Sequence, residues 1–191
     1  MILEGLTGTG KSSVLRALAR GAAHTYDMFD EEVTFGEFFA ELVAHPERPD
    51  FSRLHATLAE VERRAAAGAA YRFVLERFHP SYYALYPDRA AYAAIDRRAA
   101  ALGTAIVLLD LPDALLRERS LYRADRPEHA EALLRLYGDE TRALEALRRS
   151  RDARRAYVRA SACPHVILDT GDRAWARCAD AVGALLGGEQ A

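Results

Sequence analysis

The clearest chemical pattern in this sequence is a glycine-rich segment near its start. Residues 5–12 read Gly-Leu-Thr-Gly-Thr-Gly-Lys-Ser and match the phosphate-binding pattern G-x-x-x-x-G-K-[ST] in full. Glycines let backbone N–H groups turn toward phosphate oxygens without a Cβ in the way, and the N-terminus of the following helix adds partial positive charge. A tight turn between a strand and a helix would not need the Lys-Ser pair. We therefore predict a phosphate cradle made of Gly5, Thr7, Gly8, Thr9, Gly10, Lys11, Ser12 and Ser13.

Two side chains of this cradle have distinct expected roles. Lys11 is expected to reach the β- and γ-phosphates of a nucleotide, and the Ser12 hydroxyl is expected to bind Mg²⁺. Lys11 is also the only lysine in the chain, because every other long cationic side chain is an arginine. The compact ammonium of lysine does a job at this position that the planar guanidinium of arginine would not.

An acid and an arginine follow the apolar run of residues 71–75, which reads as a buried strand. Glu76 and Arg77 would then lie at the carboxyl end of that strand, beside the cradle. Glu76 can hold Mg²⁺ through water, and Arg77 can clamp an oxygen of the acceptor or of a phosphate. A surface ion pair at a strand end is the alternative interpretation.

Four acids follow a second predicted strand, namely Asp27, Asp30, Glu31 and Glu32. One of them could serve as general base toward a hydroxyl, since a base must lie within hydrogen-bond reach of the proton it takes. Their position favours Glu32 or Glu31, and Asp27 is a further alternative. A solvated acidic loop with only a capping role is an equally good interpretation.

Arginines cluster after the fourth predicted strand, where a lid of about residues 117–138 would close. Arginines delivered by a closing loop stabilise the charge of phosphoryl transfer, and closure also excludes water. We expect Arg119 and Arg123 to act in this way, whereas a solvated, arginine-rich helix face is the alternative. The cluster comprises Arg117, Arg119, Arg123 and Arg126.

Two further groups of residues could contact substrates. Asp169 and Thr170 could present backbone groups to an adenine ring, or they could form an ordinary turn in which Asp172 caps a helix. Arg119 is a further candidate to bind the nucleotide. An acceptor pocket could use aromatic rings that stack on a flat substrate, although a role in core packing is as good an explanation for each ring. The candidates for this pocket are His79, Ser81, Tyr82 and Tyr83.

Strand-like and helix-like segments alternate along the whole chain. This alternation predicts an α/β fold with a parallel sheet that helices cover on both faces. Ligands in such folds lie at the carboxyl ends of the strands. Thr34 and Glu37 have the spacing of a capping box, which predicts a helix that opens there. The predicted strands span residues 1–4, 24–28, 71–75, 104–109 and 165–168, and the predicted helices span residues 11–19, 34–44, 50–68, 88–102, 113–120, 128–137, 140–160 and 172–186.

Length and composition indicate a single domain, residues 1–191. Half of the 191 residues are apolar (50%), the net charge is −2 and the pI is about 6.3. This balance gives no reason to expect a nucleic acid or an anionic membrane as partner, and no apolar run is long enough to cross a bilayer. Cys163 and Cys178 lack a metal-ligand or disulfide pattern, so we expect free thiols and a cytoplasmic protein. The sequence leaves the oligomeric state open, with a homodimer as one alternative.

Several of these segments together resemble the thymidylate and deoxynucleoside kinases. Residues 2–5, Ile-Leu-Glu-Gly, run into the cradle and resemble the EG-x-x-G-x-GKS opening of that family. Residues 75–78, Leu-Glu-Arg-Phe, followed by Ser81 resemble its Asp/Glu-Arg motif. Residues 109–113, Leu-Asp-Leu-Pro-Asp, are similar to the entry to its lid helix, and residues 165–170 are similar to its last strand and adenine loop.

The resemblance implies a three-layer P-loop NTPase fold whose five-stranded parallel sheet has the order 2-3-1-4-5. It implies ATP as phosphoryl donor and a nucleoside or nucleoside monophosphate as acceptor. By position it gives Glu76 a magnesium or acceptor role and makes Arg77 a clamp for a phosphate or the acceptor. The residues to which it gives lid roles are Arg119, Arg123 and Arg126.

One departure from the family concerns the acceptor. The chain lacks the Arg-Glu-Pro type signature that thymidylate kinases carry after their second strand, and residues 27–32 place acids there instead. Clustered carboxylates would repel a phosphorylated acceptor, so a neutral hydroxyl is favoured. We predict an ATP- and Mg²⁺-dependent kinase that phosphorylates a nucleoside or nucleoside-like small molecule. The alternatives are a nucleoside monophosphate kinase and a non-kinase P-loop ATPase or regulatory protein; the Asn-Lys-x-Asp motif of GTPases is absent because Lys11 is the sole lysine.

Overall fold

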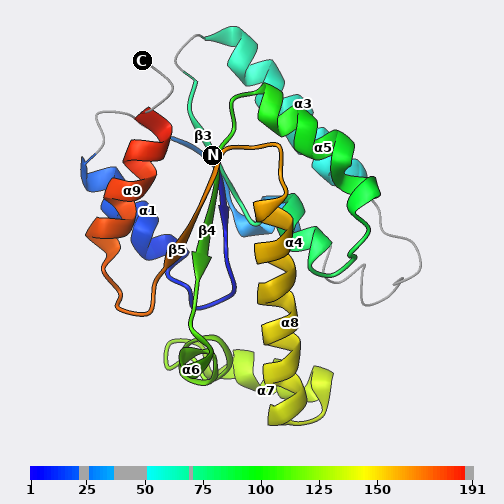
Figure 1. The fold of residues 1–191 in the computed structure, drawn as a ribbon, viewed down its shortest axis with the longest axis vertical. Helices are drawn as coiled ribbons and strands as arrows, with labels where there is room; N and C mark the ends of the chain where they lie inside the picture. The colour runs from blue at the N-terminus through cyan, green and yellow to red at the C-terminus, as the bar shows by residue number, and fades with distance from the viewer. Residues whose placement is uncertain (22–25, 37–50, 69–70, 188–191) are drawn as a thin grey trace.

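The computed structural model describes residues 1–21, 26–36, 51–68 and 71–187. Five short strands form one parallel sheet in the order β2-β3-β1-β4-β5 (Figure 1). The predicted parallel sheet and the strand order implied by the resemblance are therefore confirmed. The strands are β1 (Ile2–Glu4), β2 (Asp27–Phe29), β3 (Phe73–Glu76), β4 (Ile106–Asp110) and β5 (His165–Asp169).

Helices cover both faces of this sheet. One face packs against α1 (Lys11–Gly21) and α9 (Trp175–Gly187). The other face packs against α3 (Ser52–Ala67), α4 (His79–Tyr83), α5 (Arg89–Ala101) and α8 (Glu140–Arg159). The remaining elements are η1 (Glu32–Gly36) after β2 and the lid-region elements α6 (Asp113–Leu116), η2 (Arg117–Leu121) and α7 (Pro127–Tyr137).

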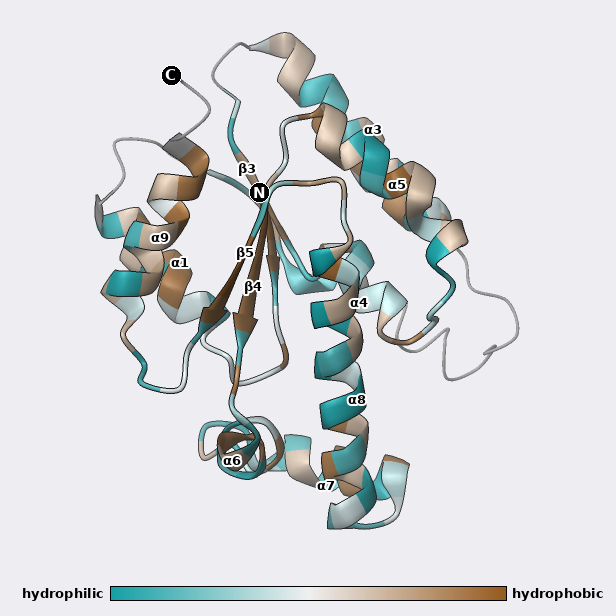
Figure 2. Cartoon of the chain, viewed as in Figure 1, coloured by the Kyte–Doolittle hydropathy of each residue, from teal (hydrophilic) through white to brown (hydrophobic). Residues whose placement is uncertain are grey.

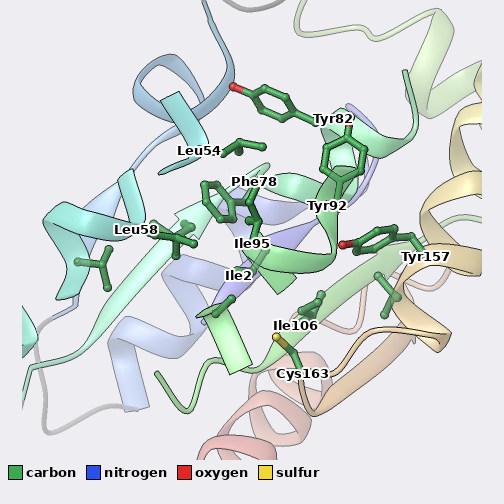
Figure 3. Close-up of a cluster of buried hydrophobic side chains, with 14 of the residues drawn as sticks. Ile2, Leu54, Leu58, Phe78, Tyr82, Tyr92, Ile95, Ile106, Tyr157 and Cys163 are labelled. Carbon is green, nitrogen blue, oxygen red and sulfur yellow. The ribbon is translucent and has the colours of Figure 1, made fainter. Parts of the chain in front are cut away.

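The strands are buried on both faces because their apolar residues alternate between two cores. Ile2 and Leu75 point into the core under α3, α5 and α8, whereas Leu3 and Val74 point into the core under α1 and α9. Figure 2 shows the resulting hydrophobic colouring of the central strands. Figure 3 shows the larger core, in which tyrosine and phenylalanine rings fill the space between the sheet and the helices.

Acids stand at the carboxyl ends of four strands. Leu3 pairs with Glu76 and Asp110 pairs with Asp169, so these ends lie along one edge of the sheet together with Glu4. In Figure 1 the arrow of β4 points toward this edge, beyond which α6 lies. Oxygen ligands and proton acceptors therefore gather at the edge where such folds bind their ligands.

The predicted helix start at Thr34 is wrong. Thr34 lies inside η1, and the side chain of Asp30 caps that turn by accepting a 3.1 Å hydrogen bond from the Val33 N–H. Aspartate is as good a cap as threonine, and the spacing of residues alone did not distinguish the two. The rest of that predicted helix, and Asp50 as the predicted start of the next, lie outside the described residues.

Several other boundaries differ from the sequence predictions. The last helix begins at Trp175 rather than at residue 172, where Asp172 was the expected cap. The second strand begins at Asp27 rather than at residue 24, which lies outside the described residues. The predicted helix 113–120 is divided into α6 and the π-helical turn η2, and the short helix α4 was not predicted.

No helix of the described residues is both long and apolar enough to span a bilayer. Cys163 and Cys178 are free, as predicted, and the structure buries both of them.

Candidate active site

The glycine-rich loop between β1 and α1 has the backbone that a phosphate cradle needs. Gly8 and Gly10 have φ angles of +86° and +94°, which side-chain-bearing residues rarely adopt. A Cβ on Gly8 would lie 1.7 Å from the carbonyl oxygen of Arg119, and one on Gly10 would lie 2.3 Å from the Trp175 ring. The Thr9 hydroxyl closes the loop by donating to the Leu6 carbonyl at 2.9 Å. Residues 8 and 10 therefore need glycine for two reasons, namely the positive φ angles and the close packing of Arg119 and Trp175 against the loop.

Lys11 is buried at the base of the cradle. Its Nζ lies 3.4 Å from the Gly5 carbonyl oxygen and 3.8 Å from Oε1 of Glu76. Burial, and secondarily the charge of Arg77, lower the pKa of Lys11 from its ordinary value to about 7. The charges of Glu31, Glu76 and Glu4 only partly offset this effect, so the negative charge of a bound phosphate would favour the protonated form of Lys11.

Glu76 lies at the end of β3, beside Lys11. Burial raises its pKa, and the nearby charge of Lys11 opposes that rise. Ser12 is exposed at the start of α1, so both residues predicted to hold Mg²⁺ offer the hard oxygen donors that this ion prefers. Among the described residues no group of three or more His, Cys, Asp or Glu side chains gathers around one point. Phosphate and water oxygens would therefore have to complete the coordination of a metal ion here.

Arg77 joins the cradle to the acidic segment after β2. Its Nη2 donates to the hydroxyl of Thr7 in the cradle, and its Nη1 lies 3.0 Å from Oε1 of Glu31. The backbone of Arg77 has a φ angle of +52°, an uncommon conformation for a residue with a side chain. Such outliers cluster at active sites, where the surrounding structure enforces them.

Of the four acids at residues 27–32, the structure brings Glu31 to the site. Asp27 begins β2, at the opposite end from the ligand edge, and accepts hydrogen bonds from Arg64 and from the Tyr71 hydroxyl. Asp30 caps η1, and Glu32 is exposed on η1. The position of Asp27 argues against its use as a base, and the contact with Arg77 favours Glu31 over Glu32.

Thr34 fixes the position of the segment that carries Glu31. This buried residue donates from its hydroxyl to the carbonyls of Asp30 and Glu76, and its own carbonyl accepts a 2.8 Å bond from the Tyr82 hydroxyl. Tyr82 is itself fully buried in the core. Glu31 is thereby held at a defined place relative to Glu76 and Arg77.

Arg119 lies against the cradle rather than on an open lid. Its guanidinium donates to the Thr170 carbonyl at 2.5 Å and to the Gly8 carbonyl at 3.1 Å, and it stands over the Trp175 ring at 5.7 Å from the ring centroid. The hydroxyl of Ser120 donates to the Thr7 carbonyl at 2.8 Å. Burial lowers the pKa of Arg119, but the pKa of a guanidinium is so high that Arg119 stays protonated. The turn η2 therefore braces the cradle with a buried cation.

Two other arginines of the predicted lid, Arg117 and Arg123, have partners outside the cradle. Arg117 is exposed and pairs with Glu140 at 2.7 Å. Arg123 donates to Asp125 at 3.0 Å, and Arg126 is exposed. Their delivery onto a phosphate by closure of residues 117–138 stays a prediction.

The predicted adenine-side residues form a turn after β5. Thr170 is buried and donates from its hydroxyl to the Asp110 carbonyl at 2.9 Å. Asp169 is exposed and accepts a 2.7 Å bond from the N–H of Gly171, and Asp172 accepts a 3.0 Å bond from the N–H of Ala174. The turn geometry is ordinary, and the Arg119 contact to Thr170 is what brings this turn to the cradle.

Sequence reasoning missed a buried charge cluster next to Arg77. Glu4 and Arg154 form it together with Ser81, which the sequence offered only as a pocket candidate, and none of the three is exposed by more than 4%. The available signal was an acid at the end of an apolar first strand, immediately before the first cradle glycine. His79 and Tyr82, considered for an acceptor pocket, are instead buried in the core, where His79 contacts Asp96 at 3.1 Å.

Comparisons with known proteins identify the fold. No protein-family model matches the sequence, and no curated protein matches it. Among solved structures, shikimate kinase from Acinetobacter baumannii in complex with shikimate is similar with a TM-score of 0.57 and 17% identity, over 99% of this chain and 93% of that chain. A gluconokinase from Sinorhizobium meliloti 1021 is similar with a TM-score of 0.53 and 18% identity, over 98% and 91% of the two chains.

Deoxyadenosine kinase from M. mycoides with bound dCTP is a third similar structure. Its TM-score is 0.52 and its identity 14%, over 98% of this chain and 100% of that chain. At such identities the likeness concerns the fold, and it covers nearly the whole of each chain. The chain therefore has the three-layer P-loop fold of the small-molecule and nucleoside kinases, as the resemblance in its sequence implied.

Proposed function

We propose that this protein is an ATP- and Mg²⁺-dependent kinase that transfers the γ-phosphoryl group of ATP to a hydroxyl of a small molecule. The observation that carries the proposal is the position of Arg77, which contacts Thr7 of the phosphate cradle and Glu31 of the acidic segment at once. A group that links a phosphate site to a carboxylate can hold donor and acceptor in line. The fold, shared with several small-molecule kinases, supports this proposal.

The donor side would bind the triphosphate through the cradle. The ammonium of Lys11 would bind the phosphates together with backbone N–H groups of the cradle, except those of Thr9 and Ser13, which already donate to the Leu6 and Gly10 carbonyls. Arg119 and Trp175 pack against the cradle and are the candidates to contact the nucleoside. Ser12 and Glu76 would hold Mg²⁺, which when bound neutralises charge on the phosphate oxygens. Arg123 would add positive charge over the migrating phosphoryl group if the lid closes.

Glu31 would act on the acceptor. In the transfer step the acceptor oxygen forms a bond to the γ-phosphorus, the bond from that phosphorus to the bridging oxygen breaks, and ADP leaves. The hydroxyl proton passes to the carboxylate of Glu31. Glu32, the other base favoured on position, is exposed on η1 and is the second candidate for this role.

A nucleoside or nucleoside-like hydroxyl compound is the first candidate acceptor. Two of the four acids that argued against a phosphorylated acceptor have cationic partners, because Asp27 pairs with Arg64 and Glu31 pairs with Arg77. Repulsion of a phosphorylated acceptor would therefore be weaker than the sequence indicates. A nucleoside monophosphate is the second candidate for this reason.

Two measurements test the proposal. Trp175 is the only tryptophan and packs on the cradle, so its fluorescence should change when ATP binds. ATP consumption should then be screened over nucleosides, nucleoside monophosphates and hydroxylated metabolites, with and without Mg²⁺. We expect ATP loss that requires both an acceptor and Mg²⁺. Loss of ATP that never depends on an acceptor would favour an ATPase, and the absence of any nucleotide binding would refute the site itself.

A further inference from the structure

Glu4 is a buried carboxylate that the proposed chemistry leaves without a role. It ends β1, directly before the first glycine of the cradle, and its side chain is 0% exposed. Its Oε1 accepts a 2.7 Å bond from the N–H of Phe78, and its Oε2 accepts a 2.7 Å bond from the Ser81 hydroxyl. A carboxylate is costly to bury, so its place next to the cradle needs a physical reason.

Arg154 of α8 supplies the opposite charge. Its Nε lies 3.5 Å from Oε2 of Glu4, and its Nε and Nη2 donate to the Ser81 hydroxyl at 3.3 Å and 3.2 Å. Burial lowers the pKa of Arg154 to about 10, and the charge of Glu4 opposes that shift. Arg154 thus keeps its proton at neutral pH, and Ser81 relays the contact between the two charged groups.

The bonds of Glu4 act on the backbone around Arg77. The N–H of Arg77 donates to the Leu3 carbonyl at 3.0 Å, as the strand ladder continues, and the next N–H, of Phe78, is taken by the Glu4 carboxylate. Between these two anchors on β1 the chain turns with the φ angle of +52° at Arg77. An arginine visits this left-handed region only when neighbouring contacts enforce it.

We propose that Glu4 is a positioning residue for Arg77: by holding Phe78 and Ser81 it keeps the backbone turned so that the Arg77 guanidinium reaches Thr7 and Glu31. The same short segment carries Glu4 and the cradle, so Glu4 fixes the acceptor-side arginine to the donor-side loop. The proposal rests on the proposed function in so far as Arg77 contacts the reacting groups. The competing explanation is that Glu4 and Arg154 only stabilise the fold.

Glu4→Gln is the first test, because it keeps the shape of the side chain and removes the negative charge that accepts a hydrogen bond from Ser81 and pairs with Arg154. We expect kcat to fall about 10- to 100-fold, since misplacement of a group by about 1 Å can cost that much. Glu62→Gln is the matched control, because Glu62 pairs with Arg98 at 2.8 Å on a partly exposed surface. It should change kcat by less than about twofold.

A double-mutant cycle with Arg77→Lys separates positioning from plain stability. If Glu4 acts through Arg77, Glu4→Gln should lower kcat by less than about twofold in a protein that already carries Arg77→Lys. The contribution of Glu4 is then already lost with Arg77, so the effects of the two substitutions are not additive. An equal fold-loss in both backgrounds would overturn the proposal. The melting temperature of each variant, measured in parallel, shows whether the loss follows unfolding.

Ser81→Ala repeats the cycle if Glu4→Gln does not fold, since it removes one bond to Glu4 and leaves the bond from Phe78. Because Arg77 contacts the cradle, the same set of variants can also be compared by their dissociation constants for ATP, measured through Trp175 fluorescence. A wild-type protein that binds ATP but phosphorylates no acceptor refutes the proposed function, and the binding cycle then still decides the role of Glu4. A wild-type protein that binds no nucleotide overturns both proposals.

Discussion

The donor side and the acceptor side of the site are held together in different ways. The cradle is closed by local contacts, such as the Thr9 hydroxyl on Leu6, three residues away, and the Lys11 ammonium on Gly5, six residues away. The acceptor side is closed by side chains that are distant in sequence, with Arg77 seventy residues from Thr7 and Phe78 seventy-four residues from Glu4. The loop conformation of the cradle is set mainly by local contacts and is braced from outside by Arg119 and Ser120 of η2, whereas the acceptor side depends on the whole sheet being assembled.

This difference predicts how each side should respond to substitution. A side chain in the cradle can be removed without loss of the fold, because neighbouring backbone groups keep the loop in shape. A side chain on the acceptor side is both a chemical group and a link between elements, so its loss should affect activity and, to differing degrees, stability. The experiments below test that distinction in order of expected effect.

Lys11→Ala should have the largest effect on transfer. Removal of the only ammonium of the cradle should lower turnover by about 10³-fold or more, because the charge of the transferred group loses its buried counterpart. The fold should survive, since burial already disfavours the charged form of Lys11. Single-turnover assays and thermal unfolding measure the two quantities, and Arg16→Ala on the exposed face of α1 is the control. Turnover retained in Lys11→Ala would contradict the donor site.

Glu31→Gln and Glu32→Gln compare the two bases that the sequence could not separate. We expect Glu31→Gln to lower kcat by about 10²-fold, the usual size of a general-base contribution. Glu32→Gln should stay within about twofold, because Glu32 is exposed on η1. Steady-state kinetics at saturating ATP and acceptor give both values. A larger loss in Glu32→Gln than in Glu31→Gln would reverse the assignment.

Glu76→Gln tests whether this acid serves chemistry or only an ion pair with Lys11. We expect kcat to fall roughly 10- to 100-fold, as for other groups that orient a metal or its water. The thermal unfolding midpoint should change little, because burial already raises the pKa of Glu76 and disfavours its charged form. A small loss of kcat together with a large loss of stability would instead support the ion pair.

The pH dependence of ATP binding should show the smallest effect. Lys11 has a pKa of about 7 in the free protein, and bound phosphates would raise it, so ATP binding takes up a proton above pH 7. The dissociation constant should therefore rise with pH above 7, by at most about tenfold per pH unit. Trp175 fluorescence titrations between pH 6 and 9 measure it. In Lys11→Arg the dependence should vanish because the guanidinium stays charged; an unchanged slope there would assign it to another group.

Much of the donor side could be predicted from the sequence. The cradle from Gly5 to Ser13 follows from residue types at fixed spacing, because the loop needs glycine where φ is positive and a lysine where phosphates bind. Glu76 and Arg77 could be placed because a buried strand precedes them. The choice among Asp27, Glu31 and Glu32 could not be made, because it depends on Arg64 and Arg77, which come from other elements.

The sequence by itself determined the alternation of strands and helices, the phosphate loop and the ligand edge of the sheet, since each depends on periodicity or on local backbone conformation. Only the tertiary structure decided that η2 braces the cradle through Arg119 and that Glu4, Ser81 and Arg154 surround the turn at Arg77. These contacts join residues that are far apart along the chain, and a buried charge finds its partner only when the sheet and α8 come together.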